Sequence, residues 1–143
     1  MIKVYRKLAN SSRQTANGQK EDMSFRFREF RVYQSAQIWI KNIFIVTVLI
    51  RNQKYFELSS QIERAAISVI LNIAEGSDHG SDKDFNRFLD ISLGSLNEVI
   101  AGLDIACESK LISLESLNTI LIESEKLAKQ LGAFKKALKS CKP

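Results

Sequence analysis

The sequence has little proline and little glycine, and this shortage restricts the folds open to it. Of its 143 residues, one is proline, at the C-terminal position 143, and six are glycine. Folds made of many short strands need turn residues at regular intervals, so this chain is expected to consist of long helices. Its length suits one domain, and 45% hydrophobic residues suffice for an ordinary packed core.

Histidine and cysteine are scarce, which excludes several kinds of site. The only histidine, His79, falls in a predicted loop, so the Glu-x-x-His pairs of di-metal bundles cannot form. Cys107 and Cys141 are too few for a disulfide framework, and we expect both to be reduced. Cys107 also lies most of a helix away from His79, so no Cys-His-acid nucleophile is expected. The sequence predicts no enzymatic activity, no metal site and no cofactor.

Long hydrophobic runs are also missing. The most apolar stretch, residues 43–50, is far shorter than the roughly 20 residues that span a bilayer. Its β-branched residues would suit a buried strand, but the flanking context favours a helix. Residues 1–20 lack the apolar core of a secretion signal. We therefore expect a cytoplasmic protein without a membrane partner.

The two ends of the chain differ from its middle. Residues 1–24 are polar and basic without sustained periodicity, which predicts a mobile tail, with a short helix near residues 4–8 as a further option. Met23 is an alternative natural start. We assign residues 25–139 to one helical domain and residues 140–143 to a C-terminal tail.

Four segments between residues 30 and 138 place apolar residues at helical spacing. They cover about residues 30–50, 56–75, 81–109 and 113–138, with Ser81 and Ser113 as helix N-caps. Short connections between amphipathic helices predict an all-α fold, an up-down-up-down antiparallel four-helix bundle. We expect Gly76 to end the second helix in a left-handed conformation, and Gly94 and Gly102 to allow another backbone to approach the third.

The first helix has two apolar stripes. One contains Tyr33, Ala36, Ile40, Ile43, Phe44 and Thr47, and the other contains Val32, Trp39, Val46 and Leu49. A bundle core needs only one stripe, so we expect the second to meet another subunit or, less often, a partner helix.

Charge is distributed unevenly along the chain. Residues 23–54 carry six basic and one acidic side chains, residues 55–112 carry four and ten, and residues 113–143 carry six and three. The basic segments can attract nucleic-acid phosphates. They can equally attract the acidic middle segment, within one chain or between subunits, so both interpretations stay open.

The stretches LSSQIERAAIS at 58–68, NIAEG at 72–76 and FNRFLDISLGSLNE at 85–98 resemble a known family. It consists of the four-helix bundle proteins encoded by intervening sequences in bacterial 23S ribosomal RNA genes, and the resemblance covers about residues 27–138. It implies a ring-like homopentamer without established enzymatic activity. It also implies kinship with the accessory protein of diversity-generating retroelements, a basic pentamer associated with nucleic acid and a reverse transcriptase.

The chain departs from the family pattern at two places, one within the second helix and one between the first and second helices. Ile70 and Leu71 stand where the family usually has a proline and a small polar residue, and Ile50 and Arg51 stand where it tends to have Phe-Pro. Loss of the first proline should straighten the second helix. Without the second proline, the boundary between the first and second helices, at residues 51–55, is the least defined in the domain.

Two sets of residues are candidates for function. A polar cluster within the family motifs consists of Asn72, Glu75, Arg87, Ser95, Asn97 and Glu98. We expect Asn72 and Glu75 to reach Lys83 or Arg87 across the helical hairpin, which would serve either to fix helix register or to bind a partner. The residues expected to contact RNA phosphates without reading sequence are Arg28, Arg31, Lys41, Arg51, Lys126, Lys129, Lys135, Lys136 and Lys139.

The sequence shows no aromatic-rich platform on which bases would stack. The predicted function is therefore an RNA- or nucleoprotein-associated homo-oligomer, as the resemblance implies a pentamer. The alternative is a structural or protein-interaction scaffold without nucleic-acid binding, such as a reverse-transcriptase accessory subunit.

Overall fold

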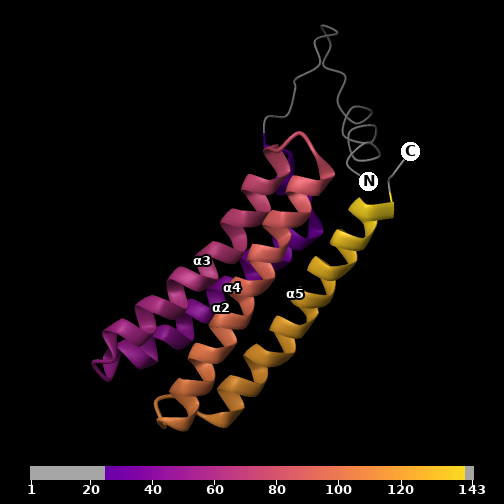
Figure 1. The fold of residues 1–143 in the computed structure, drawn as a ribbon. Helices are drawn as coiled ribbons and strands as arrows, with labels where there is room; N and C mark the ends of the chain where they lie inside the picture. The colour runs from indigo at the N-terminus through magenta and orange to yellow at the C-terminus, as the bar shows by residue number, and fades with distance from the viewer. Residues whose placement is uncertain (1–24, 141–143) are drawn as a thin grey trace, which may run out of the picture.

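The computed structural model describes residues 25–140, which form helices joined by short turns (Figure 1). Their order is the short 3₁₀ helix η1 (Arg26–Glu29), α2 (Arg31–Asn52), α3 (Phe56–Asp78), α4 (Asp82–Glu108) and α5 (Leu114–Ser140). The described range contains no strand. The predicted tail at residues 1–24, the optional helix near residues 4–8, Met23 and Cys141 lie outside it.

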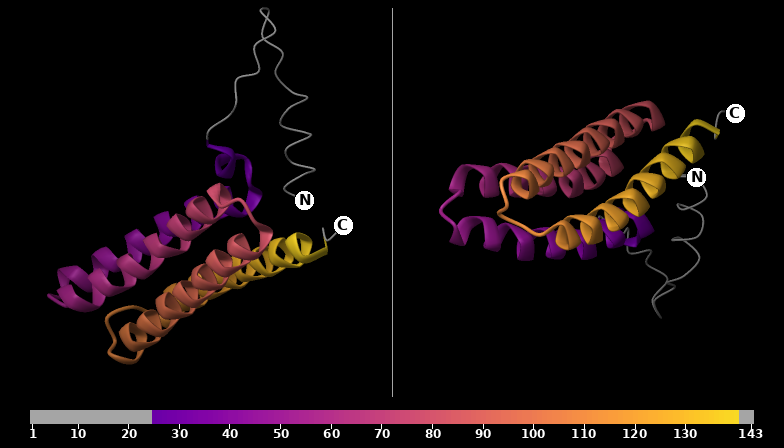
Figure 2. Two further views of the ribbon diagram at one scale, coloured as in Figure 1. Left: turned by 45° about the horizontal axis from the view of Figure 1, so that its top comes forward. Right: turned by 90° about the horizontal axis from the view of Figure 1, so that it is seen from below.

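The four long helices make the predicted antiparallel bundle. Each packs against the next along the chain, and α5 closes the bundle against α2. The connections are short, with residues 53–55 and 109–113 at one end and residues 79–81 at the other. In the right-hand view of Figure 2, the C-terminal part of α5 diverges from α2 toward the end that carries η1. The order and packing of the four long helices confirm the predicted all-α four-helix bundle.

The core follows the predicted apolar stripes of the second, third and fourth helices. Ile62, Val69 and Ile73 of α3 are buried against the α4 stripe, which extends from Phe85 to Ala106. Leu127, Leu131 and Leu138 supply the α5 side. The predicted caps also form, since the Oγ atoms of Ser81 and Ser113 accept hydrogen bonds from the backbone N–H groups of Asp84 and Ser116, each at 3.1 Å. Hydrophobic periodicity thus determined which face of these helices is buried.

The prediction for the first helix was wrong in one respect. Val32, Trp39 and Val46, assigned to a stripe that meets another subunit, are buried inside the bundle of the single chain. α2 packs against both α3 and α5, so its buried surface is wider than one stripe. Leu49, the fourth member of that stripe, is exposed, and so are Ile38, Phe44, Ile45 and Val48 of α2.

The ends of α2 and α4 have the same local structure. Lys54 and Lys110 adopt positive φ angles of 69° and 59°. Beyond α4, the N–H groups of Lys110 and Leu111 donate to the carbonyl oxygens of Cys107 and Ala106, at 2.9 and 2.8 Å. The corresponding bonds follow α2, so both ends are Schellman motifs with lysine at the position that glycine usually occupies. The motif at Lys54 ends α2 although the proline that the family pattern places near residue 51 is absent.

Gly76 has a different role from the one predicted. α3 continues beyond it to Asp78, so the glycine lies inside the helix rather than at its left-handed end. A Cβ atom at Gly76 would lie 2.5 Å from Cδ2 of Phe85 and 2.8 Å from Cβ of Phe88. Glycine is therefore needed for the close approach of α4. α3 is also uninterrupted at Ile70, as the loss of the family proline predicts.

The two glycines of α4 also differ from the prediction. A Cβ atom at Gly102 would lie 2.6 Å from Cγ1 of Ile62, so a side chain rather than a backbone approaches this position. A Cβ atom at Gly94 would meet nothing within 4 Å among the described residues. Of the two glycines of α4, Gly102 is therefore the one whose small size is needed for packing among the described residues.

Candidate nucleic-acid interface

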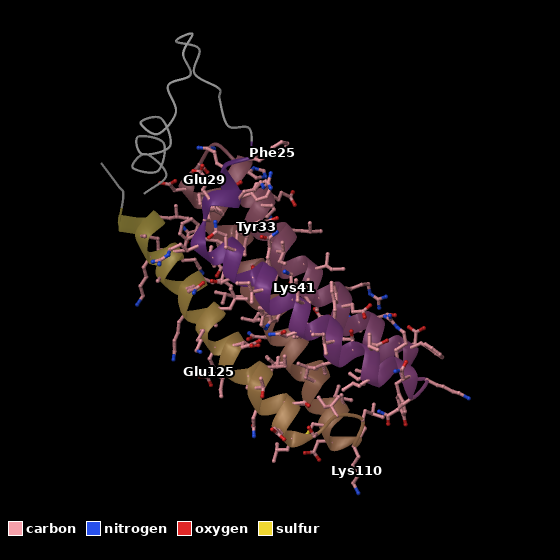
Figure 3. The ribbon with its side chains drawn as sticks, turned by 180° about the vertical axis from the view of Figure 1, so that it is seen from behind. Phe25, Glu29, Tyr33, Lys41, Lys110 and Glu125 are labelled. Atoms are coloured by element: carbon pink, nitrogen blue, oxygen red, sulfur yellow. The ribbon has the colours of Figure 1, made fainter. Side chains whose placement is uncertain are left out.

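Most of the residues predicted to contact RNA lie on exposed parts of α2 and α5. Seven are exposed, namely Arg28, Arg31, Lys41, Lys126, Lys129, Lys136 and Lys139. The α5 lysines 126, 129 and 136 recur at steps of three and seven residues, so they share one face of the helix. α2 carries Arg31, Lys41 and Arg51 and no acidic residue. Figure 3 shows Lys41 midway along α2. Two neighbouring helices thus expose basic side chains.

Two of the nine predicted residues, Arg51 and Lys135, form ion pairs with acidic residues of the neighbouring helices. Nη2 of Arg51 lies 2.6 Å from Oε2 of Glu63, whose Oε1 accepts a hydrogen bond from the buried Thr47 at 2.7 Å. Nζ of Lys135 pairs with Oδ1 of Asp90. These contacts join α2 to α3 and α5 to α4. Both cations therefore have a structural partner, and Arg28, Arg31, Lys41, Lys126, Lys129 and Lys139, which form no ion pair with a described residue, are the better candidates for phosphate contacts.

A groove lies between α2 and α5 where the two helices diverge. Its larger cavity has a volume of about 610 Å³ and is lined by Phe30, Arg31, Val32, Ser35, Gln130, Ala133 and Phe134. A second cavity of about 180 Å³ continues it, since the two share Ser35 and Gln130. Ile38, Trp39, Glu123, Lys126 and Leu127 complete the lining of the second cavity. We call the two together the α2/α5 groove.

Aromatic rings form one wall of this groove. The ring centroids of Phe30 and Phe134 are 5.1 Å apart, and that of Phe134 is 5.3 Å from the fully buried Phe85. Arg31 and Lys126 lie at the same groove, and neither forms an ion pair with a described residue. This combination could not be predicted from the sequence because Phe30 and Phe134 are far apart in the chain. No periodic signal in the sequence could have paired them.

Part of the predicted polar cluster is assembled in the structure, by residues of α3 and α4. Ser95 Oγ lies 2.8 Å from Ser68 Oγ, and Nδ2 of Asn72 donates to the backbone oxygen of Ser68 at 2.8 Å. Glu98 accepts a hydrogen bond from Gln61. The buried Ser92 donates to the backbone oxygen of Val69 at 2.8 Å. These contacts support the interpretation that the cluster fixes the register of the two helices.

The other members of the cluster do not make the expected contacts. Within residues 25–140, the side chains of Glu75 and Asn97 form no hydrogen bond or ion pair, so Asn72 and Glu75 do not lock the hairpin onto Lys83 or Arg87. The guanidinium of Arg87 instead lies 5.2 Å from the ring centroid of Phe88. His79 stacks on the same ring with a centroid distance of 4.6 Å. The turn is held by aromatic packing rather than by a salt bridge.

The described residues offer little for metal chemistry. Among them, no three or more His, Cys, Asp or Glu side chains gather in a way that could hold a metal ion. Cys107 is a free, half-buried thiol on α4. None of the helices between residues 25 and 140 combines the length and the apolar character needed to cross a membrane.

These observations define a four-helix bundle with basic residues exposed on its first and last long helices. The family model for the 23S rRNA-intervening sequence protein matches residues 28–133, so the chain belongs to that family. The match begins within η1 and covers most of the described bundle.

A solved structure shares this fold. It is the crystal structure of a protein of unknown function from the S23 ribosomal protein family of Bacteroides thetaiotaomicron VPI-5482. The two chains are 28% identical and superpose with a TM-score of 0.69, over 73% of this chain and 98% of the other. A comparison with curated proteins gives no match.

Proposed function

We propose that this protein is a non-enzymatic, cytoplasmic, homopentameric module that associates with RNA or a nucleoprotein. The observation that carries the proposal is the set of exposed cations on α2 and α5, together with the absence of acidic residues from α2. Exposed lysine and arginine side chains bind phosphates by charge and release condensed counterions, without reading sequence. The family's association with a ribosomal RNA gene is consistent with such a partner.

The contribution to RNA binding is expected to differ among the nine predicted residues. Arg51 and Lys135 would have to give up their partners Glu63 and Asp90 before contacting a phosphate. Lys126 and Lys129, which are exposed and lie on one face of α5, have no such partner in the described chain. We therefore assign the main phosphate contacts to the exposed residues of α5 and to Arg28, Arg31 and Lys41.

Exposed apolar side chains support the oligomer. Ile38 and Ile45 of α2 are each 65% exposed, seven residues apart on one helical face, and Val48 and Leu49 extend this patch. Exposed apolar residues also lie on α3, at Ile67 and Leu71, and on α4, at Ile91, and we assign these three to a second patch. Two different patches on one chain suit a head-to-tail contact, which closes into a ring when the rotation allows. Leu71 belongs to this patch although the family usually has a small polar residue there.

Binding of a structured RNA to the purified oligomer tests the function. We expect measurable affinity at 50 mM salt and a steep fall in the association constant as the salt concentration rises, because several phosphates are neutralised. A folded oligomer that shows no binding at low salt would refute the RNA proposal.

A scaffold without nucleic-acid binding is the second candidate, and two contacts favour it. The Arg51–Glu63 and Lys135–Asp90 pairs show that cations of the basic helices already neutralise acids of the middle helices. If RNA binding is absent while the oligomer persists, this function replaces the first.

A further inference from the structure

We propose that the α2/α5 groove holds one unpaired nucleotide of a bound RNA, with the base against Phe134 and the flanking phosphates near Arg31 and Lys126. This inference rests on the proposed RNA association and adds a site that recognises a base. The basic faces of α2 and α5 would bind any phosphate backbone, whereas this groove would distinguish an unpaired nucleotide from a regular duplex.

The groove has the size and wall that a base needs. Its larger cavity of about 610 Å³ lies within the range of roughly 300–1,000 Å³ that is typical of small-ligand pockets. The half-buried Phe134 packs against the buried rings of Phe85 and Phe30, which hold its ring in place from within the bundle. A supported aromatic ring next to an open cavity is the arrangement on which bases stack in single-stranded nucleic-acid sites.

Polar groups at the groove suit the edge of a base. Ser35 and Gln130 line both cavities, and neither side chain makes a hydrogen bond within the described chain. A hydroxyl and a carboxamide can each donate and accept, as the Watson–Crick edges of bases require. These two side chains are therefore free to contact a base that enters between the helices.

The charges around the groove favour an anionic ligand over a neutral apolar one. Arg31 lines the larger cavity and Lys126 the smaller, and both lack an ion-pair partner among residues 25–140. Glu123 is the one acidic residue that lines either cavity, and both of its carboxylate oxygens accept hydrogen bonds from Nδ2 of Asn42 at 2.9 Å. A nucleotide combines an apolar ring face with negative phosphates and so complements this lining.

A matched pair of RNA hairpins tests the inference with the full-length protein. One hairpin carries a single bulged adenosine, and the other carries an abasic ribose at the same position, so the number of phosphates is equal. We expect the adenosine hairpin to bind about tenfold more tightly, which corresponds to the lower part of the range for one base–aromatic stack. Equal affinities for the two hairpins would overturn the inference.

Substitutions in the α2/α5 groove test whether the preference for the bulged base arises there. Phe134→Leu keeps the apolar packing but removes the aromatic face, and we expect it to abolish the preference for the bulged base. Gln130→Ala changes an exposed side chain, so it provides a second test if Phe134→Leu fails to fold. We expect it to reduce the preference at least threefold. Gln37→Ala, at an exposed glutamine of α2 that does not line the groove, serves as the control and should leave the preference unchanged.

The outcomes separate this inference from the proposed function. Salt-dependent binding of both hairpins with equal affinity leaves the RNA function in place and removes the base site. A preference for adenosine that persists in both groove variants also overturns the site. If neither hairpin binds at 50 mM salt, the proposed function itself fails, and the groove site fails with it.

Discussion

Trp39 and Ser124 form a buried polar pair that ties α2 to α5. Nε1 of the indole donates to Oγ of the serine at 2.9 Å, and both side chains are almost fully buried. Trp39 also lines the α2/α5 groove, so this hydrogen bond fixes one wall of the proposed site.

Ser124→Ala should destabilise the protein more than an ordinary surface substitution. It leaves the buried N–H of Trp39 without an acceptor, which costs about 1–3 kcal/mol in the free energy of unfolding. Chemical denaturation monitored by circular dichroism measures the loss. Thr119→Ala, at an exposed position of the same helix, is the control. A value for Ser124→Ala no larger than that of the control would show that the hydrogen bond contributes little.

Gly76→Ala and Gly94→Ala should have opposite effects on stability. A Cβ atom at Gly76 would collide with Phe85 and Phe88, and such overpacking typically costs about 1–3 kcal/mol. A Cβ atom at Gly94 meets open space, and alanine in a helix interior is favoured over glycine by up to about 1 kcal/mol. Thermal unfolding of the two variants gives the comparison. An increase in melting temperature for Gly76→Ala would contradict the packing seen at this glycine.

Lys110→Gly should stabilise the protein by about 0.5–1 kcal/mol. Lysine pays a steric cost at a φ of 59°, whereas glycine adopts this conformation freely. The gain is smaller than the full cost because glycine is also more flexible in the unfolded chain. Lys110→Ala keeps the Cβ atom and should give no such gain. Equal stability of the two variants, measured by denaturant unfolding, would rule out this explanation.

Ile45→Glu should dissociate the oligomer. Ile45 is 65% exposed on α2, within the patch to which we assign a subunit contact, and a buried unpaired carboxylate there would be costly. Light scattering at micromolar concentration measures the mass. Ile122→Glu, at a position 57% exposed on α5, is the matched control and should leave the mass unchanged. A monomeric wild-type protein, or an unchanged mass of Ile45→Glu, would contradict the proposed contact.

Lys126→Gln should weaken RNA binding and reduce its dependence on salt. Each lost phosphate contact lowers the slope of log K against log salt by about 0.7–0.9. Lys83→Gln removes the same charge from an exposed position in the first turn of α4, outside the proposed interface. The comparison therefore separates a local contact from an effect of net charge. Equal slopes for the two variants would argue against a contact at Lys126.

The sequence predicted the helices and most of the core because both depend on local periodicity. The stripes from Leu58 to Ile73 and from Phe85 to Ala106 lie on the inner faces of α3 and α4, and the caps at Ser81 and Ser113 form as expected. Cap and stripe signals need only residues within a few positions of one another.

The errors concern features that depend on a neighbouring helix. Gly76 was predicted to end a helix because glycine commonly does so, but here two phenylalanines of α4 require its small size. The stripe with Trp39 was assigned to another subunit because one stripe normally suffices, whereas α2 contacts two neighbours in the bundle. Spacing along one helix does not show how many helices surround it.

For the candidate site, too, some properties follow from the sequence and others from the tertiary structure. The sequence by itself determined that α2 and α5 are basic and that the chain has a single histidine and two cysteines, because composition and charge are properties of the residues alone. Only the tertiary structure decided that Arg51 and Lys135 are paired and that Phe30 and Phe134 meet beside Arg31. Such contacts depend on the packing angle between α2 and α5, which is set by the side chains of the whole core.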